Sequence, residues 1–185
     1  MTQLPVPYNA LEMLITADKI ATRVTELAGE ITKKLPPDIM IVSLLRGSFV
    51  FTSDLVRALH LANPSATTGP QVDFMTMASY GSNTVSSGRV EITRDLTEKV
   101  EGRDVLIVDD ILESGRTLAF ARKLVLSRGA KSVHIVVLLE KPGKRKAEID
   151  ADFVGFTIPD KFVVGYGLDY ANYYRELPYI GVISA

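Results

Sequence analysis

Two adjacent carboxylates, a third acid and a short run of small hydroxyl-bearing residues follow one apolar segment of the chain. The apolar segment Val105–Val108 leads into Asp109 and Asp110, and Glu113 then precedes Ser114-Gly-Arg-Thr117. Free amides at the start of a helix, together with hydroxyl groups, suit a phosphate, and glycine lets the backbone come close to it. Acids seldom lie at the mouth of an apolar strand without a partner. The spacing therefore predicts a phosphate-binding loop beside an acidic pair.

This stretch has three alternative interpretations. Gly-Arg-Thr alone is equally compatible with a plain helix cap whose neighbouring acids are solvated. A Walker phosphate loop is excluded, because it needs glycine where Asp110 stands and lysine where Arg116 stands. A dinucleotide-binding fold has no support, because no Gly-x-Gly-x-x-Gly follows the first apolar strand.

The elements that must position this loop alternate between helices and buried strands. Thr16 can cap a helix whose apolar residues recur every three or four positions until Pro36 ends it. Apolar runs predict strands at Ile39–Leu45, Gln71–Met77, Arg89–Thr93, Asp104–Val108, Ser132–Leu139, Phe153–Thr157 and Val163–Gly165. Further helices are expected from Gly47 to about His60 and from Gly115 to Arg128. This alternation predicts an α/β fold with a largely parallel sheet flanked by helices on both faces.

Length and composition limit the function classes. With 185 residues the chain fits a single domain, with a core at about residues 36–140 and a smaller C-terminal part at about 141–185. A net charge of −1 gives no electrostatic attraction to nucleic acid or to a membrane surface. The absence of cysteine excludes disulfides and thiolate metal sites. We expect a cytoplasmic protein that binds neither nucleic acid nor membrane.

The acidic stretch resembles the signature of type I phosphoribosyltransferases, which is two acids, two apolar residues, an acid and then Ser/Thr-Gly-x-Thr. The resemblance implies that Asp109 and Asp110 contact the ribose hydroxyls of 5-phosphoribosyl 1-diphosphate. It also implies that the loop Ser114, Gly115, Arg116 and Thr117 binds the 5′-phosphate.

Further segments resemble the hypoxanthine-guanine phosphoribosyltransferases, which act on 6-oxopurine bases. The resemblance implies that Lys141, Phe162 and Val163 bind the purine, that Asp169 holds Mg²⁺, and that Arg46, Gly47 and Arg175 bind pyrophosphate. In that family a non-proline cis peptide precedes the basic residue of the pyrophosphate loop, and the C-terminal third, with N-terminal residues, forms a small hood subdomain. The uncharged stretch from Ser79 through Tyr80 to Gly88 is expected to act as a lid. We also expect a homodimer or a homotetramer.

Three positions depart from the family's pattern. Asp109 stands where glutamate is more frequent, and Arg46 stands where lysine is frequent. Glu113 stands where the family usually has the aspartate that accepts a proton from purine N7, so the resemblance implies that Glu113 is the catalytic base.

Two alternatives are disfavoured. A non-catalytic regulator that senses nucleotides would have lost a base-site residue or gained a basic surface, whereas Lys141, Phe162 and Asp169 are present and the net charge is near zero. A sister enzyme for adenine, orotate or uracil is disfavoured by the resemblance of the C-terminal segments to the purine-binding hood.

Overall fold

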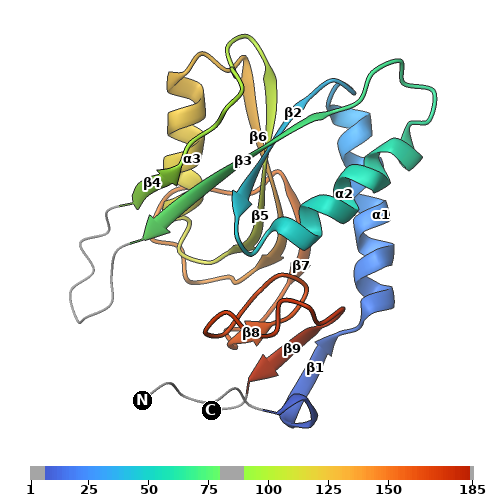
Figure 1. Cartoon of the computed structure of the whole chain (residues 1–185), viewed down its shortest axis with the longest axis vertical. Coiled ribbons are helices and arrows are strands. Elements are labelled where there is room, and N and C mark those ends of the chain that lie inside the picture. Colours follow the sequence, from blue (N-terminus) through green and yellow to red (C-terminus); the bar gives the residue numbers. More distant parts are fainter. Residues whose placement is uncertain (1–6, 80–89, 184–185) are drawn as a thin grey trace.

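A computed structural model describes residues 7–79 and 90–183 of the chain (Figure 1). In chain order the elements are a 3₁₀ turn (Tyr8–Ala10), β1 (Leu11–Ile15), α1 (Ala17–Lys34), β2 (Met40–Leu45), α2 (Phe49–Ala62), β3 (Gln71–Ser79), β4 (Val90–Arg94), β5 (Asp104–Leu112), α3 (Arg116–Ser127), β6 (Ser132–Glu140), β7 (Phe153–Thr157), β8 (Val163–Val164) and β9 (Ile180–Ile183).

The central sheet has the strand order β4-β3-β2-β5-β6-β7. All neighbours in it are parallel except β3 and β4, which run antiparallel. Helices α1 and α2 lie on one side of the sheet and α3 lies on the other (Figure 1). The predicted α/β class with a largely parallel, helix-flanked sheet is confirmed.

The continuous apolar runs have a direct structural cause. Along β5, Leu106 and Val108 face the core beneath α1 and α2, whereas Val105 and Ile107 face the core beneath α3. Because successive side chains of a strand point to opposite faces, a strand covered on both sides must be apolar at every position. The central strands therefore cannot show the alternating pattern of a half-exposed strand.

Helix α1 follows its predicted pattern closely. The Thr16 hydroxyl accepts a hydrogen bond from the Lys19 amide at 3.4 Å, as an N-cap residue does. The buried side chains are Ile20, Val24, Leu27, Ala28 and Ile31. In the described part of the chain, no helix is long and apolar enough to cross a membrane.

A second, three-stranded sheet has the order β1-β9-β8 and joins the two ends of the chain. It lies below the carboxyl ends of the central strands in Figure 1. We call this sheet, with residues 165–179, the hood. Strands β1 and β9 were not predicted, because each is short and their pairing with each other spans more than 160 residues of sequence.

Candidate active site

Three neighbouring parallel strands deliver the predicted site residues to one edge of the sheet. Strand β2 ends at Leu45, β5 at Leu112 and β6 at Glu140. Arg46, Glu113 and Lys141 follow them directly. Because the carboxyl ends of parallel strands meet at one edge, residues from distant parts of the sequence gather there.

The acidic pair lies inside β5 and not after it. The prediction that the strand ends at Val108 was wrong, because β6 continues to offer pairing partners: Asp109 pairs with Val137 and Leu112 with Glu140. Asp109 is buried, at 9% exposure. Burial, and then the neighbouring Asp110, raises the pKa of Asp109 well above its usual value. Burial also raises the pKa of Asp110. Hydroxyl donors from a ligand would offset the cost of ionising this pair.

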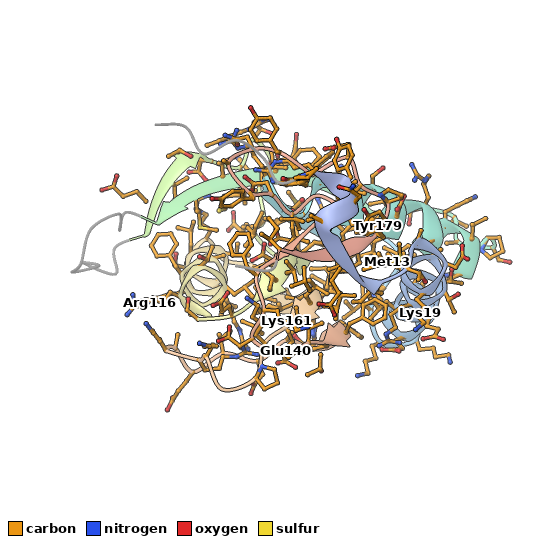
Figure 2. The ribbon with its side chains drawn as sticks, turned by 90° about the horizontal axis from the view of Figure 1, so that it is seen from below. Met13, Lys19, Arg116, Glu140, Lys161 and Tyr179 are labelled. Carbon is orange, nitrogen blue, oxygen red and sulfur yellow. The ribbon has the colours of Figure 1, made fainter. Side chains whose placement is uncertain are left out.

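The predicted phosphate loop connects β5 to α3. Gly115 takes a left-handed conformation, with φ of 76°, and caps α3, which begins at Arg116. The first turn of a helix leaves amides without intrahelical acceptors, so the amides near Arg116 and Thr117 are suited to an anion. Figure 2 shows the Arg116 side chain on the outer side of α3. The loop therefore offers a ligand backbone groups together with the Ser114 and Thr117 hydroxyls.

The predicted pyrophosphate loop lies against the acidic pair. The peptide bond between Leu45 and Arg46 is cis. A Cβ atom built on Gly47 would lie 1.5 Å from Oδ2 of Asp110, so no larger residue fits while Asp110 keeps its place. Beneath this loop the Ser43 hydroxyl lies 2.8 Å from both the Ser48 and the Thr52 hydroxyls, and all three side chains are buried.

One cleft gathers the predicted base-binding residues with acids of the site. Its walls include six predicted residues, Asp110, Glu113, Lys141, Phe162, Val163 and Asp169. Lys141 is buried at 6% exposure, and its ammonium lies 3.3 Å from Oε2 of Glu113 and 3.9 Å from Oδ1 of Asp160. Phe162 is 52% exposed and meets Tyr170 edge-on, with ring centroids 5.6 Å apart. An exposed ring beside a buried ammonium suits a flat, polar ligand such as a base.

The candidate metal ligand is held by the hood. Oδ1 of Asp169 lies 2.7 Å from Nη2 of Arg175, and Oδ2 accepts a hydrogen bond from the Asn172 amide at 2.7 Å. Arg175 also donates to the carbonyl oxygen of Gly167 at 2.6 Å. Arg175 therefore reaches the cleft through Asp169. Among the described residues, no three His, Asp or Glu side chains form a ready metal-binding group.

The lid prediction falls largely outside the described residues. Ser79 is the last residue of β3, and Tyr80 and the rest of the predicted lid, to Gly88, lie outside the described part of the chain.

Several residues that shape the site were missed by sequence reasoning. Tyr166 of the hood donates a hydrogen bond to Asp54 of α2, the helix that follows the pyrophosphate loop. Arg145 donates to the backbone just before the phosphate loop. No local pattern marks either residue, because each acts through a contact with a distant segment.

Comparisons with known proteins show the family of the chain. The phosphoribosyl transferase domain family matches residues 11–171. The chain is similar to the hypoxanthine-guanine phosphoribosyltransferase of Bacillus subtilis, with 48% identity over 178 residues covering 96% of this chain and 95% of the relative. It is 44% identical to the hypoxanthine phosphoribosyltransferase of Escherichia coli over 178 residues, covering 95% and 96%. A crystal structure of a hypoxanthine phosphoribosyltransferase from Staphylococcus aureus matches with a TM-score of 0.87 and 44% identity, covering 96% of this chain and 94% of that chain. The chain therefore belongs to the phosphoribosyltransferases and, within them, to the hypoxanthine-guanine phosphoribosyltransferase family.

Proposed function

We propose that this protein is a purine salvage enzyme. It transfers the phosphoribosyl group of 5-phosphoribosyl 1-diphosphate to hypoxanthine or guanine, giving IMP or GMP and diphosphate, with Mg²⁺ as cofactor. Family membership supports the reaction class. The observation that carries the choice of base is the buried ammonium of Lys141 beside the exposed ring of Phe162.

The choice of a 6-oxopurine follows from the hydrogen-bonding capacity of that ammonium. A lysine ammonium has three donors and no acceptor. The 6-oxo group of hypoxanthine or guanine accepts a hydrogen bond, whereas the 6-amino group of adenine donates one. Adenine would leave the buried Lys141 donor facing another donor, which disfavours it strongly.

The remaining residues divide the work along the substrate. Asp109 and Asp110 accept hydrogen bonds from the ribose hydroxyls, and the loop Ser114–Thr117 holds the 5′-phosphate. Arg46, Gly47 and Arg175 bind the diphosphate, whose negative charge grows as it leaves. The bond between ribose C1 and the diphosphate oxygen breaks, a bond from C1 to purine N9 forms, and Glu113 accepts the proton lost from N7. Fixing both reactants in this geometry supplies much of the rate enhancement.

The acidic residues of the site provide some, but not all, of the ligands that a Mg²⁺ ion needs. Asp169 and the acidic pair provide the oxygen ligands that Mg²⁺ prefers, but Asp169 is paired with Arg175. Mg²⁺ usually binds through one or two carboxylates together with water and substrate phosphates. The bound ion would neutralise charge on the diphosphate, and Asp169 is the residue proposed to hold it. We further propose that the enzyme works in the cytoplasm as a homodimer or homotetramer.

The role of Lys141 can be tested against a neighbouring lysine. Lys144 also pairs with the carboxylate of Asp160, with its Nζ atom 2.5 Å from Oδ2, but the side chain of Lys144 is 44% exposed. Losing a donor to a buried carbonyl costs roughly 1–3 kcal/mol, so Lys141→Met should raise the KM for hypoxanthine about 5–150-fold. The KM for 5-phosphoribosyl 1-diphosphate should change much less, and Lys144→Met should change neither. Equal purine kinetics in the two variants would remove Lys141 from the base site.

A further inference from the structure

Arg145 lies outside the cleft, yet its side chain holds the backbone on which the phosphate loop is built. Its Nη1 atom donates to the carbonyl oxygen of Leu112 at 3.1 Å and to that of Glu113 at 3.0 Å. Its Nε atom donates to the carbonyl oxygen of Ile149 at 3.2 Å, and its Nη2 atom is paired with Glu140. Only 23% of the side chain is exposed. The guanidinium therefore contacts both ends of the loop that follows β6, at Glu140 and at Ile149, and also the end of β5 at Leu112.

The backbone that follows Arg145 continues the same contact. The amides of Lys146 and Ala147 donate to the carbonyl oxygen of Ser114 at 2.9 and 3.2 Å. A Cβ atom built on Gly115 would lie 2.4 Å from Cγ2 of Ile149, so this segment closes directly on the loop. We call residues 145–149 the strap. The strap thus binds three consecutive carbonyl groups, those of Leu112, Glu113 and Ser114.

These three carbonyl groups lie where β5 loses its strand partner. The pairing of β5 with β6 ends at Leu112 and Glu140. The carbonyl oxygen of Leu112 still accepts a hydrogen bond from the Lys141 amide at 3.0 Å, in addition to the one from Arg145. The carbonyl groups of Glu113 and Ser114 lie beyond the ladder, and the strap supplies hydrogen-bond donors to them. Backbone carbonyl groups need donors, and a charged guanidinium is a stronger donor than a neutral amide.

Fixing the carbonyls also fixes the amides. In a planar trans peptide the C=O of one residue and the N–H of the next point in opposite directions. With the carbonyl groups of Leu112, Glu113 and Ser114 held toward the strap, the amides of Glu113, Ser114 and Gly115 point away from it. Arg145 therefore sets the direction of loop amides without approaching the ligand.

We propose that Arg145 is a positioning residue for the 5′-phosphate, and this inference rests on the proposed function. It orients the loop amides from behind, through Leu112 and Glu113, and keeps the backbone of the proposed catalytic base in place. Its effect belongs to the binding of 5-phosphoribosyl 1-diphosphate more than to the binding of the purine, because its hydrogen bonds reach the backbone that leads into the phosphate loop, whereas the ring of Phe162 lies on another segment.

Arg23 offers a matched control for a purely structural role. Its side chain is also 23% exposed. It donates to the carbonyl oxygens of Val154 at 2.8 Å and Gly155 at 3.0 Å, and it pairs with Glu30 at 2.7 Å. These contacts tie α1 to β7, away from the cleft. Arg23→Met and Arg145→Met therefore remove comparable sets of bonds from comparable surroundings.

The test compares the two variants in the whole enzyme. Both should lower the melting temperature. Arg145→Met alone should raise the KM for 5-phosphoribosyl 1-diphosphate roughly 10–100-fold, since misplacing a binding group by about 1 Å has effects of that size. The KM for hypoxanthine should stay nearly unchanged in both. Arg145→Lys keeps the charge but not the fork of donors, so its KM should lie between those of the wild type and Arg145→Met. If Arg145→Met does not fold, the kinetics of Arg145→Lys test the inference in its place.

Two outcomes would overturn the inference. One is an Arg145→Met or Arg145→Lys enzyme whose kinetic constants match those of Arg23→Met. The other, read without activity, is amide hydrogen exchange at Glu113–Thr117 that is no faster in the Arg145 variants than in Arg23→Met. A wild-type protein that forms no nucleotide would instead refute the proposed function, and the exchange measurement would still decide whether Arg145 orients the loop.

Discussion

The acids of the candidate site differ in burial and in partners, and these differences separate their proposed roles. Asp109 is buried beside Asp110. Its burial is the larger cause of its raised pKa, and the neighbouring carboxylate of Asp110 is the second cause. Glu113 is exposed, and its carboxylate accepts a hydrogen bond from Lys141 at 3.3 Å. A buried pair suits fixed contacts with hydroxyl groups, whereas an exposed acid at the rim is free to approach a ring nitrogen.

The substitution Glu113→Gln tests whether Glu113 is the catalytic base. The amide keeps the shape of the side chain but cannot accept a proton, so kcat should fall by at least about 10²-fold while binding of 5-phosphoribosyl 1-diphosphate stays nearly intact. Glu113→Asp should remain active, because it keeps the carboxylate. Steady-state kinetics of the two variants give the comparison. If the Gln variant loses less than about tenfold in kcat, Glu113 is no general base.

Asp109→Asn should stabilise the free protein at neutral pH. A carboxyl group with a raised pKa in the folded state favours folding only while protonated, so its contribution is complete below about pH 4 and is lost as pH rises through the folded pKa. Asparagine cannot ionise, and its oxygen can still accept the Asp110 amide, which lies 3.0 Å from Oδ1. The gain should be about 0.5–2 kcal/mol at pH 7 and vanish near pH 4, with weaker ribose binding. Thermal unfolding across pH measures it, and a lower melting temperature at pH 7 would contradict it.

At the scale of elements, sequence patterns predicted what is local and missed what is not. The cap and apolar spacing of α1 are contained in its own sequence, and the prediction was confirmed. The end of β5 was misplaced, because polar residues look like a strand end although β6 keeps pairing with them. The hood strands β1 and β9 pair with each other across almost the whole chain, and β9 pairs otherwise with the two-residue strand β8, so neither has a strong local signal.

The contact between Tyr166 and Asp54 joins the hood to α2. Burial, and then Asp54, raises the pKa of Tyr166, so its hydroxyl remains a donor at all ordinary pH values. A hydrogen bond to a charged group contributes about 1.5–3 kcal/mol, and Tyr166→Phe should lower the free energy of unfolding by that amount.

Tyr8→Phe is the matched control for this prediction. The Tyr8 hydroxyl donates to Glu176 at 2.8 Å, but Tyr8 is 60% exposed, so water replaces the lost bond. Urea unfolding of both variants should show a loss for Tyr166→Phe and no measurable change for Tyr8→Phe. Equal behaviour of the two would mean that the buried contact does not stabilise the hood.

At the scale of the whole molecule, the parallel sheet explains why a site could be predicted from scattered segments. Arg46, Glu113 and Lys141 are far apart in sequence, yet each follows a strand whose carboxyl end lies at the same edge. Motif spacing therefore identified residues that meet at this edge, and two of these three, Glu113 and Lys141, line the cleft. Supporting residues such as Arg145 could not be predicted, because their importance lies in which carbonyl groups they reach, and only the folded chain shows this.

The proposed reaction of the whole site joins a 6-oxopurine to a phosphoribosyl group. Its most direct test is nucleotide formation from 5-phosphoribosyl 1-diphosphate and Mg²⁺ with hypoxanthine, guanine and adenine in parallel, following nucleotide and diphosphate together. We predict IMP and GMP, each with one equivalent of diphosphate, and kcat/KM for adenine lower by at least about 10²-fold, because the 6-amino group of adenine cannot accept the Lys141 hydrogen bond. Adenine as the preferred base, or no nucleotide from any of the three, would contradict the account.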